Sequence, residues 1–132
     1  MIFSSECANY VAAHSCARGE ERQMLDMLRK SLPASLSSID WSRIIKKKEV
    51  NGVDRARLSN ELKVLSTSMG AAITDVFYVF NLDDAVPALK TSLSEWLRFV
   101  SELDFVDTIF LSKSGKLIIH WDFYMNLHAT TI

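Results

Sequence analysis

The chain has 132 residues, is 48% apolar and carries a net charge of −1, with only two cysteines, two prolines and four glycines. This composition predicts one globular domain with an ordinary hydrophobic core, and it argues against a disordered linker or a strongly basic nucleic-acid binder. Charge is unevenly distributed, because residues 1–70 contain 11 Lys and Arg and 8 Asp and Glu, whereas residues 71–132 contain 4 and 8. We therefore expect a helical half, 1–70, and an acidic half, 71–132, within a single domain spanning 1–132.

The sequence predicts a cytoplasmic protein. Cys7 and Cys16 are nine residues apart, which on one helix is roughly 13 Å along the axis and too far for a disulfide. Such cysteines are typical of buried thiols in a reducing compartment. The N-terminal segment lacks the pattern of a signal peptide, and no apolar run approaches the roughly 20 residues that a membrane span needs.

Three helices are predicted in the first half of the chain. The first runs from Ser5 to Ala17, and the second runs from Glu20 to Leu32 and is stopped by Pro33. The third opens at Asp54 and ends at Gly70. Its apolar residues recur at helical spacing on one face: Leu58, Leu62, Leu65 and Met69.

Residues 34–53 form the least regular stretch, with a short helix opened by Asp40 and a turn at Asn51–Gly52. They contain the main basic cluster of the chain, Lys46–Lys48, with Arg43, Arg55 and Arg57 nearby. This cluster has the charge to contact phosphate, but a solvated turn is the interpretation we favour. No interleaved aromatic platform for bases accompanies it, so no nucleic-acid partner is expected.

The second half begins with a strand and a helix. Residues Asp75 to Leu82 are dense in Val, Phe and Tyr, which predicts a buried strand. A helix is then expected from Asp84 to Glu102, with Pro87 in its first turn. Asp83 and Asp84 would cap this helix and interact favourably with its N-terminal dipole.

A β-hairpin is predicted at the end of the chain. Residues Asp107–Ser112 and Leu117–Tyr124 form its strands, and Lys113–Lys116, with Gly115 in the third position, forms its turn. The predicted cross-strand pairs are Phe110 with Ile119 and Thr108 with Trp121. We expect these two strands and the strand at 75–82 to form a sheet of about three strands.

The two sides of the predicted hairpin differ in character. The apolar side is expected to face the core and holds Phe110, Leu117, Ile119, Trp121 and Phe123. The mixed side holds Asp107, Ile109, Leu111, Ile118, His120, Asp122 and Tyr124. A mixed side suits either partial cover by a helix or a binding surface. Asp107 opposite Asp122 would repel, so this end of the hairpin is expected to splay or to be exposed.

The sequence offers little support for catalysis. His120 and Asp122 share one strand face, as a general base oriented by a carboxylate would require. No Ser or Cys nucleophile is placed beside them, so a polar strand face is the favoured interpretation. The three histidines and two cysteines lack the spacing of common zinc sites, and no phosphate-binding loop is present. We expect neither a metal nor a cofactor.

Two segments carry a resemblance to a known class of protein: DVFYVFNLDDAVPALKTSLSEWLRF at 75–99 and DTIFLSKSGKLIIHWDFY at 107–124. They resemble the small cytoplasmic immunity proteins of bacterial contact-dependent growth inhibition and related polymorphic toxin systems. The resemblance implies a non-catalytic, single-domain protein that binds a toxin domain encoded by a neighbouring gene and blocks its active site.

We thus predict an α+β fold in which the N-terminal helices pack with a small sheet, and a function in neutralising a toxin. Nuclease toxins need a basic cleft, which an acidic partner would neutralise. The partner-binding residues proposed from the sequence are Asp83, Asp84, Asp107, His120, Asp122 and Tyr124. The alternatives are a regulatory or adaptor protein that acts through a homodimer or partner interface, and a small hydrolase that uses His120 and Asp122.

Overall fold

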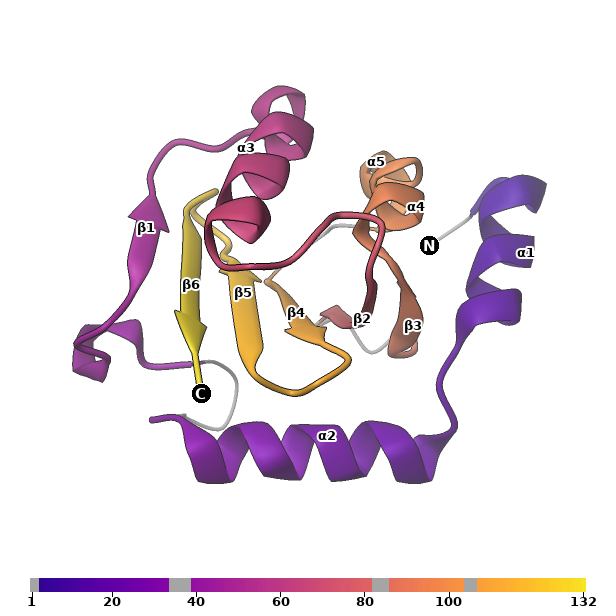
Figure 1. The fold of residues 1–132 in the computed structure, drawn as a ribbon. Coiled ribbons are helices and arrows are strands. Elements are labelled where there is room, and N and C mark those ends of the chain that lie inside the picture. The colour runs from indigo at the N-terminus through magenta and orange to yellow at the C-terminus, as the bar shows by residue number, and fades with distance from the viewer. Residues whose placement is uncertain (1–2, 34–38, 82–85, 104–106) are drawn as a thin grey trace.

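A computed structural model describes residues 3–33, 39–81, 86–103 and 107–132 of the chain (Figure 1). Its centre is a six-stranded antiparallel sheet. The strands are β1 (Lys48–Val50), β2 (Val76–Asn81), β3 (Leu89–Ser92), β4 (Thr108–Ser112), β5 (Leu117–Trp121) and β6 (Leu127–Thr131). Their order across the sheet is β1-β6-β5-β4-β2-β3, so β5 and β4 lie at its centre.

Helices cover both faces of the sheet. They are α1 (Ser5–His14), α2 (Arg18–Ser31), α3 (Arg55–Ser68), α4 (Leu93–Leu97) and α5 (Val100–Leu103), with a short 3-10 helix, η1, at Trp41–Arg43. In Figure 1, α3, α4 and α5 lie above the sheet, α2 runs along the opposite side, and α1 stands beside β3. None of the helices in the described ranges has the length and apolar character needed to cross a membrane.

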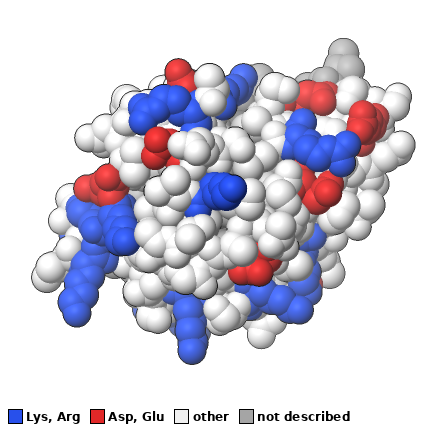
Figure 2. Space-filling view, turned by 45° about the horizontal axis from the view of Figure 1, so that its top comes forward, with Lys and Arg blue, Asp and Glu red and all other residues white. Residues whose placement is uncertain are grey.

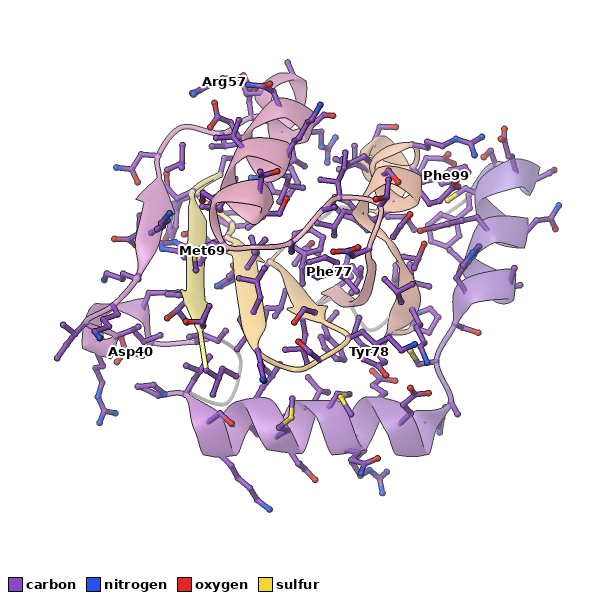
Figure 3. The ribbon with its side chains drawn as sticks, viewed as in Figure 1. Asp40, Arg57, Met69, Phe77, Tyr78 and Phe99 are labelled. Carbon is purple, nitrogen blue, oxygen red and sulfur yellow. The ribbon has the colours of Figure 1, made fainter. Side chains whose placement is uncertain are left out.

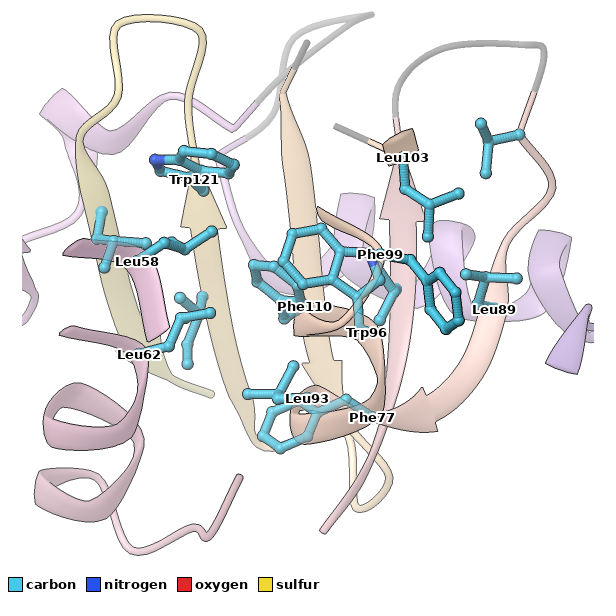
Figure 4. Packing of buried hydrophobic residues seen from close by; sticks show 14 of the residues in the cluster. Leu58, Leu62, Phe77, Leu89, Leu93, Trp96, Phe99, Leu103, Phe110 and Trp121 are labelled. Atoms are coloured by element: carbon cyan, nitrogen blue, oxygen red, sulfur yellow. The ribbon is translucent and has the colours of Figure 1, made fainter. Parts of the chain in front are cut away.

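Each face of the sheet has its own hydrophobic core. The larger core joins α3 and α4 to the apolar side of the hairpin (Figure 4). The smaller core joins α2 and η1 to the other side. Phe77 and Tyr78, neighbours on β2, belong to different cores and point in different directions in Figure 3. Alternation along each strand therefore assigns successive side chains to the two cores.

The predicted hairpin register is confirmed. Phe110 pairs with Ile119, and Thr108 pairs with Trp121. Gly115 closes the turn with φ 77°, a left-handed conformation that only glycine adopts without strain. Lys113 and Lys116 are exposed on either side of it, as expected.

The helix predicted from Asp84 to Glu102 is wrong. Residues Leu89–Ser92 form β3, which pairs antiparallel with β2, and the chain becomes helical only at Leu93. The Ser92 side chain caps α4 by accepting a hydrogen bond from the Glu95 amide at 3.2 Å. Leu89 and Thr91 are buried while Lys90 is exposed, so this segment alternates with the period of a strand. The caps predicted at 83 and 84 lie outside the described residues.

The sheet is also larger than the predicted three strands. Two short strands, β1 and β6, extend it beyond β5. At the other edge, Ser15 forms an isolated bridge with Leu89, which ends α1 at His14 rather than at Ala17. The fold is therefore α+β as predicted, but its sheet draws strands from both halves of the chain.

Candidate functional site at the β5–β6 turn

Four of the six predicted site residues meet at one end of the sheet. Asp107 precedes β4, His120 lies near the end of β5, and Asp122 and Tyr124 follow β5 in the turn that leads to β6. Because β4 and β5 are antiparallel, the start of one strand adjoins the end of the other. The two remaining residues, Asp83 and Asp84, lie outside the described part of the chain.

His120 is a buried structural histidine with both ring nitrogens engaged. The Trp41 indole N–H donates to its Nδ1 at 2.8 Å, and its Nε2 lies 3.0 Å from Asp107 Oδ1. Since an indole nitrogen can only donate, Nδ1 must accept and the ring proton resides on Nε2, which donates to the carboxylate. The His120 side chain is only 2% exposed. Its ring therefore links η1 to the start of β4.

A second histidine, His128 on β6, also has both ring nitrogens engaged, here by two carboxylates. Its Nε2 lies 2.7 Å from Asp122 Oδ2, and its Nδ1 contacts Glu49 Oε2 on β1. Because carboxylates only accept, both hydrogen bonds form together when each ring nitrogen carries a proton. The Trp41 ring stacks on His128 with centroids 5.1 Å apart and an interplanar angle of 17°. Trp41 thus contacts both histidines.

The two carboxylates also hold the backbone of the β5–β6 turn. Asp122 Oδ1 accepts hydrogen bonds from the Tyr124 amide at 2.9 Å and the Asn126 amide at 3.0 Å. Asp107 Oδ1 accepts one from the Phe123 amide at 3.0 Å. The paired register of β4 and β5 ends at Thr108 and Trp121, and beyond it the Asp107 and Asp122 carboxylates each bond to a different histidine and to the turn backbone.

The loop between β1 and α3 supports the turn from the other side. The Gly52 amide donates to Asn126 Oδ1 at 3.1 Å, and the Val53 amide donates to the Met125 carbonyl at 2.6 Å. The Val53 carbonyl in turn accepts from the Trp121 indole at 2.9 Å. Met125 adopts a φ of 60°, an uncommon conformation for a residue that is not glycine. This network holds it there.

Residues 122–126, which we name the aromatic turn, present large apolar side chains to solvent. Phe123 is 63% exposed, Tyr124 is 80% exposed and Met125 is 41% exposed. Phe123 was predicted to face the core, and that prediction is wrong. Strand β5 ends at Trp121 because the Asp122 side chain bonds the following amides and turns the chain outward.

The two predicted acidic residues that the structure describes, Asp107 and Asp122, do not reach outward. The side chains of Asp107 and Asp122 are only 26% and 17% exposed, and both bond inward to histidines. On the face shown in Figure 2, Lys and Arg are interspersed with Asp and Glu, without a purely acidic area. The most exposed feature at this end of the sheet is therefore aromatic rather than acidic.

Trp41, Glu49 and His128 were missed by sequence reasoning as members of the site. Trp41 and Glu49 come from η1 and β1, far from the hairpin in sequence, and His128 lies on β6, a strand just after the hairpin that was not predicted. The paired polar residues at the two ends of the turn, Asp122 and Asn126, are the one local signal that indicates a turn held by side chains.

Two residues of the Lys46–Lys48 cluster, Lys46 and Lys47, have hydrogen-bond partners within the protein. Lys47 Nζ donates to the Trp41 carbonyl at 2.7 Å and lies 3.6 Å from Glu49 Oε1. The Lys46 carbonyl accepts from Thr130 Oγ1 at 2.6 Å. These contacts tie the segment before β1 to β6 and to η1, and Lys48 lies on β1 itself rather than in the predicted solvated turn.

The described residues give little support for a catalytic nucleophile or a metal site. Cys16 lines a surface hollow of about 400 Å³ beside Arg18 and Pro87. Burial raises the pKa of the Cys16 thiol to about 11, so the thiol stays protonated at neutral pH. Nowhere in the described ranges do three His, Cys, Asp or Glu side chains gather in a way that could hold a metal ion.

We expect the His120–Asp107 pair to stabilise the fold in a pH-dependent way. The hydrogen bond from His120 lowers the pKa of the Asp107 carboxyl below its ordinary 3.8, against the opposing effect of burial. Folding therefore favours the ionised form, and its contribution is fully present above a pH of about 4 and is lost as the pH falls through the native pKa. Urea unfolding between pH 7 and pH 2 measures this loss.

Asp107→Asn should flatten the acid limb of that stability curve. Asp26→Asn, at an exposed carboxylate on α2, is the matched control and should leave the curve unchanged. Identical curves for wild type and Asp107→Asn would contradict the coupling between Asp107 and His120.

The amino-acid sequence matches no protein-family model, and no curated protein is significantly similar to it.

Proposed function

We propose that this protein is a non-catalytic binding protein that neutralises a cognate bacterial toxin by covering the toxin's active site. The observation that carries the proposal is the aromatic turn, where exposed Phe and Tyr side chains stand on a backbone fixed by hydrogen bonds. Aromatic side chains supply much of the energy at protein interfaces. A backbone that is already ordered loses little conformational entropy on binding.

The geometry at the two histidines favours binding over hydrolysis. A general base needs a ring nitrogen that can take a proton from substrate or water. His120 has both nitrogens bonded within the protein, to Trp41 and Asp107. His128 has both nitrogens on carboxylates, those of Glu49 and Asp122. These bonds support a structural role for both histidines.

The adaptor alternative receives less support than the immunity function. It would be favoured by an exposed apolar stripe along a helix. Among the described helical residues, Val64 on α3 is the one large apolar side chain that is more than half exposed. A single exposed Val is ordinary for a protein surface.

The immunity function is supported by the resemblance over residues 75–124 and by the exposed aromatic turn within the second half of the chain. The toxin is proposed to be a protein domain, with a nuclease as the leading candidate. The acidic excess of residues 71–132 suits a basic nuclease cleft at long range. Direct contacts are expected to come from the aromatic turn.

The proposal predicts that a neighbouring reading frame encodes a large secreted protein, and the test uses the C-terminal domain of that protein. We expect its expression in a bacterial host to stop growth and co-expression of this protein to restore growth. The purified protein should bind a catalytically inactive form of that domain in titration calorimetry, with an empty vector and an unrelated small protein as controls. Growth arrest that persists on co-expression, together with no measurable binding, would refute the proposal.

A further inference from the structure

We infer that the aromatic turn inserts Tyr124 and Phe123 into an apolar pocket on the partner protein, and that acidic charge does not lead this contact. The inference rests on the proposed function and specifies the chemistry of the partner's surface. It differs from the acidic contact expected from the sequence: Asp107 and Asp122 bond inward to histidines, and the other two candidates, at 83 and 84, lie outside the described residues.

The aromatic turn has a convex apolar tip. Three consecutive side chains, Phe123, Tyr124 and Met125, project from a turn at the end of the sheet. The Phe123 and Tyr124 rings meet edge to face with centroids 5.6 Å apart, so they form one apolar tip. A convex apolar tip gains most when a concave apolar surface removes both rings from water.

The backbone of the aromatic turn is ordered by hydrogen bonds within the protein. Every amide N–H from Asp122 to Asn126 donates a hydrogen bond within the protein. The Asp122 amide donates to the Asn126 carbonyl, and the Met125 amide donates to the Asp122 carbonyl, both at 3.0 Å. The other three amides donate to the Asp107 and Asp122 carboxylates. The turn is therefore held in one conformation before any partner binds, which favours affinity.

The charged side chains described beneath and beside the tip have partners within the protein. The carboxylates beneath the tip are bonded to His120 and His128 and to turn amides. On the adjoining surface at the start of α3, Arg57 pairs with Glu61 at 3.2 Å and donates to the Gly52 carbonyl. Among the described residues of the tip, no carboxylate is left unpaired for a cationic partner, so the complement of the tip itself is an uncharged apolar pocket.

Titration calorimetry against the inactive toxin domain tests this inference at several salt concentrations. We expect Tyr124→Ala to weaken binding about 30-fold or more, as loss of a central aromatic anchor does, and Phe123→Ala to weaken it about tenfold. Val64→Ala, at an exposed apolar residue on α3, is the matched control and should change affinity less than about twofold. The melting temperatures of all three variants should stay close to that of wild type.

The salt dependence of binding affinity distinguishes an apolar contact from an acidic one. For an apolar contact we expect the loss of affinity caused by Tyr124→Ala to be the same, within about threefold, at 0.05 M and 0.5 M NaCl, because screening acts on charges and any long-range attraction is common to both proteins. If the Tyr124→Ala variant neutralises the toxin as well as wild type does, or if its loss of affinity disappears at high salt, the inference would be overturned while the proposed function stays intact. Self-association of the wild type that Tyr124→Ala abolishes in sedimentation experiments would also overturn it, since the occupant would be a second copy. Absence of any binding by the wild type would refute both.

Discussion

Trp121→Ala is expected to lower the free energy of unfolding by about 3–5 kcal/mol, as truncation of a fully buried Trp does. Trp121 is 1% exposed and belongs to the same core cluster as Leu58 and Phe110 (Figure 4). Its indole N–H also satisfies the buried Val53 carbonyl, which would lose this partner. Urea unfolding monitored by circular dichroism measures the change.

Phe123→Ala is the matched control for this prediction. Phe123 follows Trp121 by two residues, and strand alternation alone would place both in the core. Because Phe123 is exposed, its truncation should cost less than about 0.5 kcal/mol. A cost below 1 kcal/mol for Trp121→Ala, or equal costs for the two variants, would contradict both the hairpin register and the end of β5 at Trp121.

His120→Ala is expected to lower the free energy of unfolding by about 2–4 kcal/mol. The substitution leaves the Trp41 indole N–H without its acceptor and removes the hydrogen bond to Asp107. Each buried polar group left unsatisfied costs about 1–3 kcal/mol. His14→Ala, at a half-buried histidine on α1 whose Nδ1 contacts the Tyr10 carbonyl, is the control and should cost less than about 1 kcal/mol.

A double-mutant cycle identifies the cause of this loss. Trp41→Phe removes the indole N–H but keeps an aromatic ring, so the cycle with His120→Ala isolates the bond between them. We expect a coupling energy of about 1–3 kcal/mol, as for other residues in direct contact. Additive effects would mean that the bond contributes nothing. The hydrolase alternative makes the opposite prediction: His120→Ala would abolish an activity towards ester, phosphate or nucleic-acid substrates while barely changing stability.

The structural role of the aspartates alters the interpretation of charge-reversal experiments. If Asp107 and Asp122 reached outward as partner-binding residues, charge reversal at either would slow association with a toxin and leave the melting temperature nearly unchanged. In the structure each carboxylate bonds a histidine and at least one turn amide. We therefore expect these variants to unfold at lower temperature, so any loss of toxin binding must be compared with Tyr124→Ala, which leaves the turn intact.

The amino-acid sequence by itself determined the local elements with strong periodicity. Helix α3 follows from the regular spacing of its leucines and from the Asp54 side chain, which caps it by accepting from the Arg57 amide at 3.0 Å. The hairpin register follows from a four-residue turn with glycine at the left-handed position and from apolar alternation on both strands. In both cases residues close in the sequence supply the specifying contacts.

Tertiary structure decided β3 and the aromatic turn. Leu89 and Leu93 are spaced as on a helix, but an open edge on β2 pairs with residues 89–92 and selects a strand. Phe123 continues the alternation of β5, yet hydrogen bonds to Asp107 and Asp122 end the strand before it. The partners of His120 and His128, Trp41 and Glu49, come from about 79 residues earlier in the chain. Hydrophobic periodicity reports only local spacing, so contacts between such distant segments are fixed by the packing of the whole sheet.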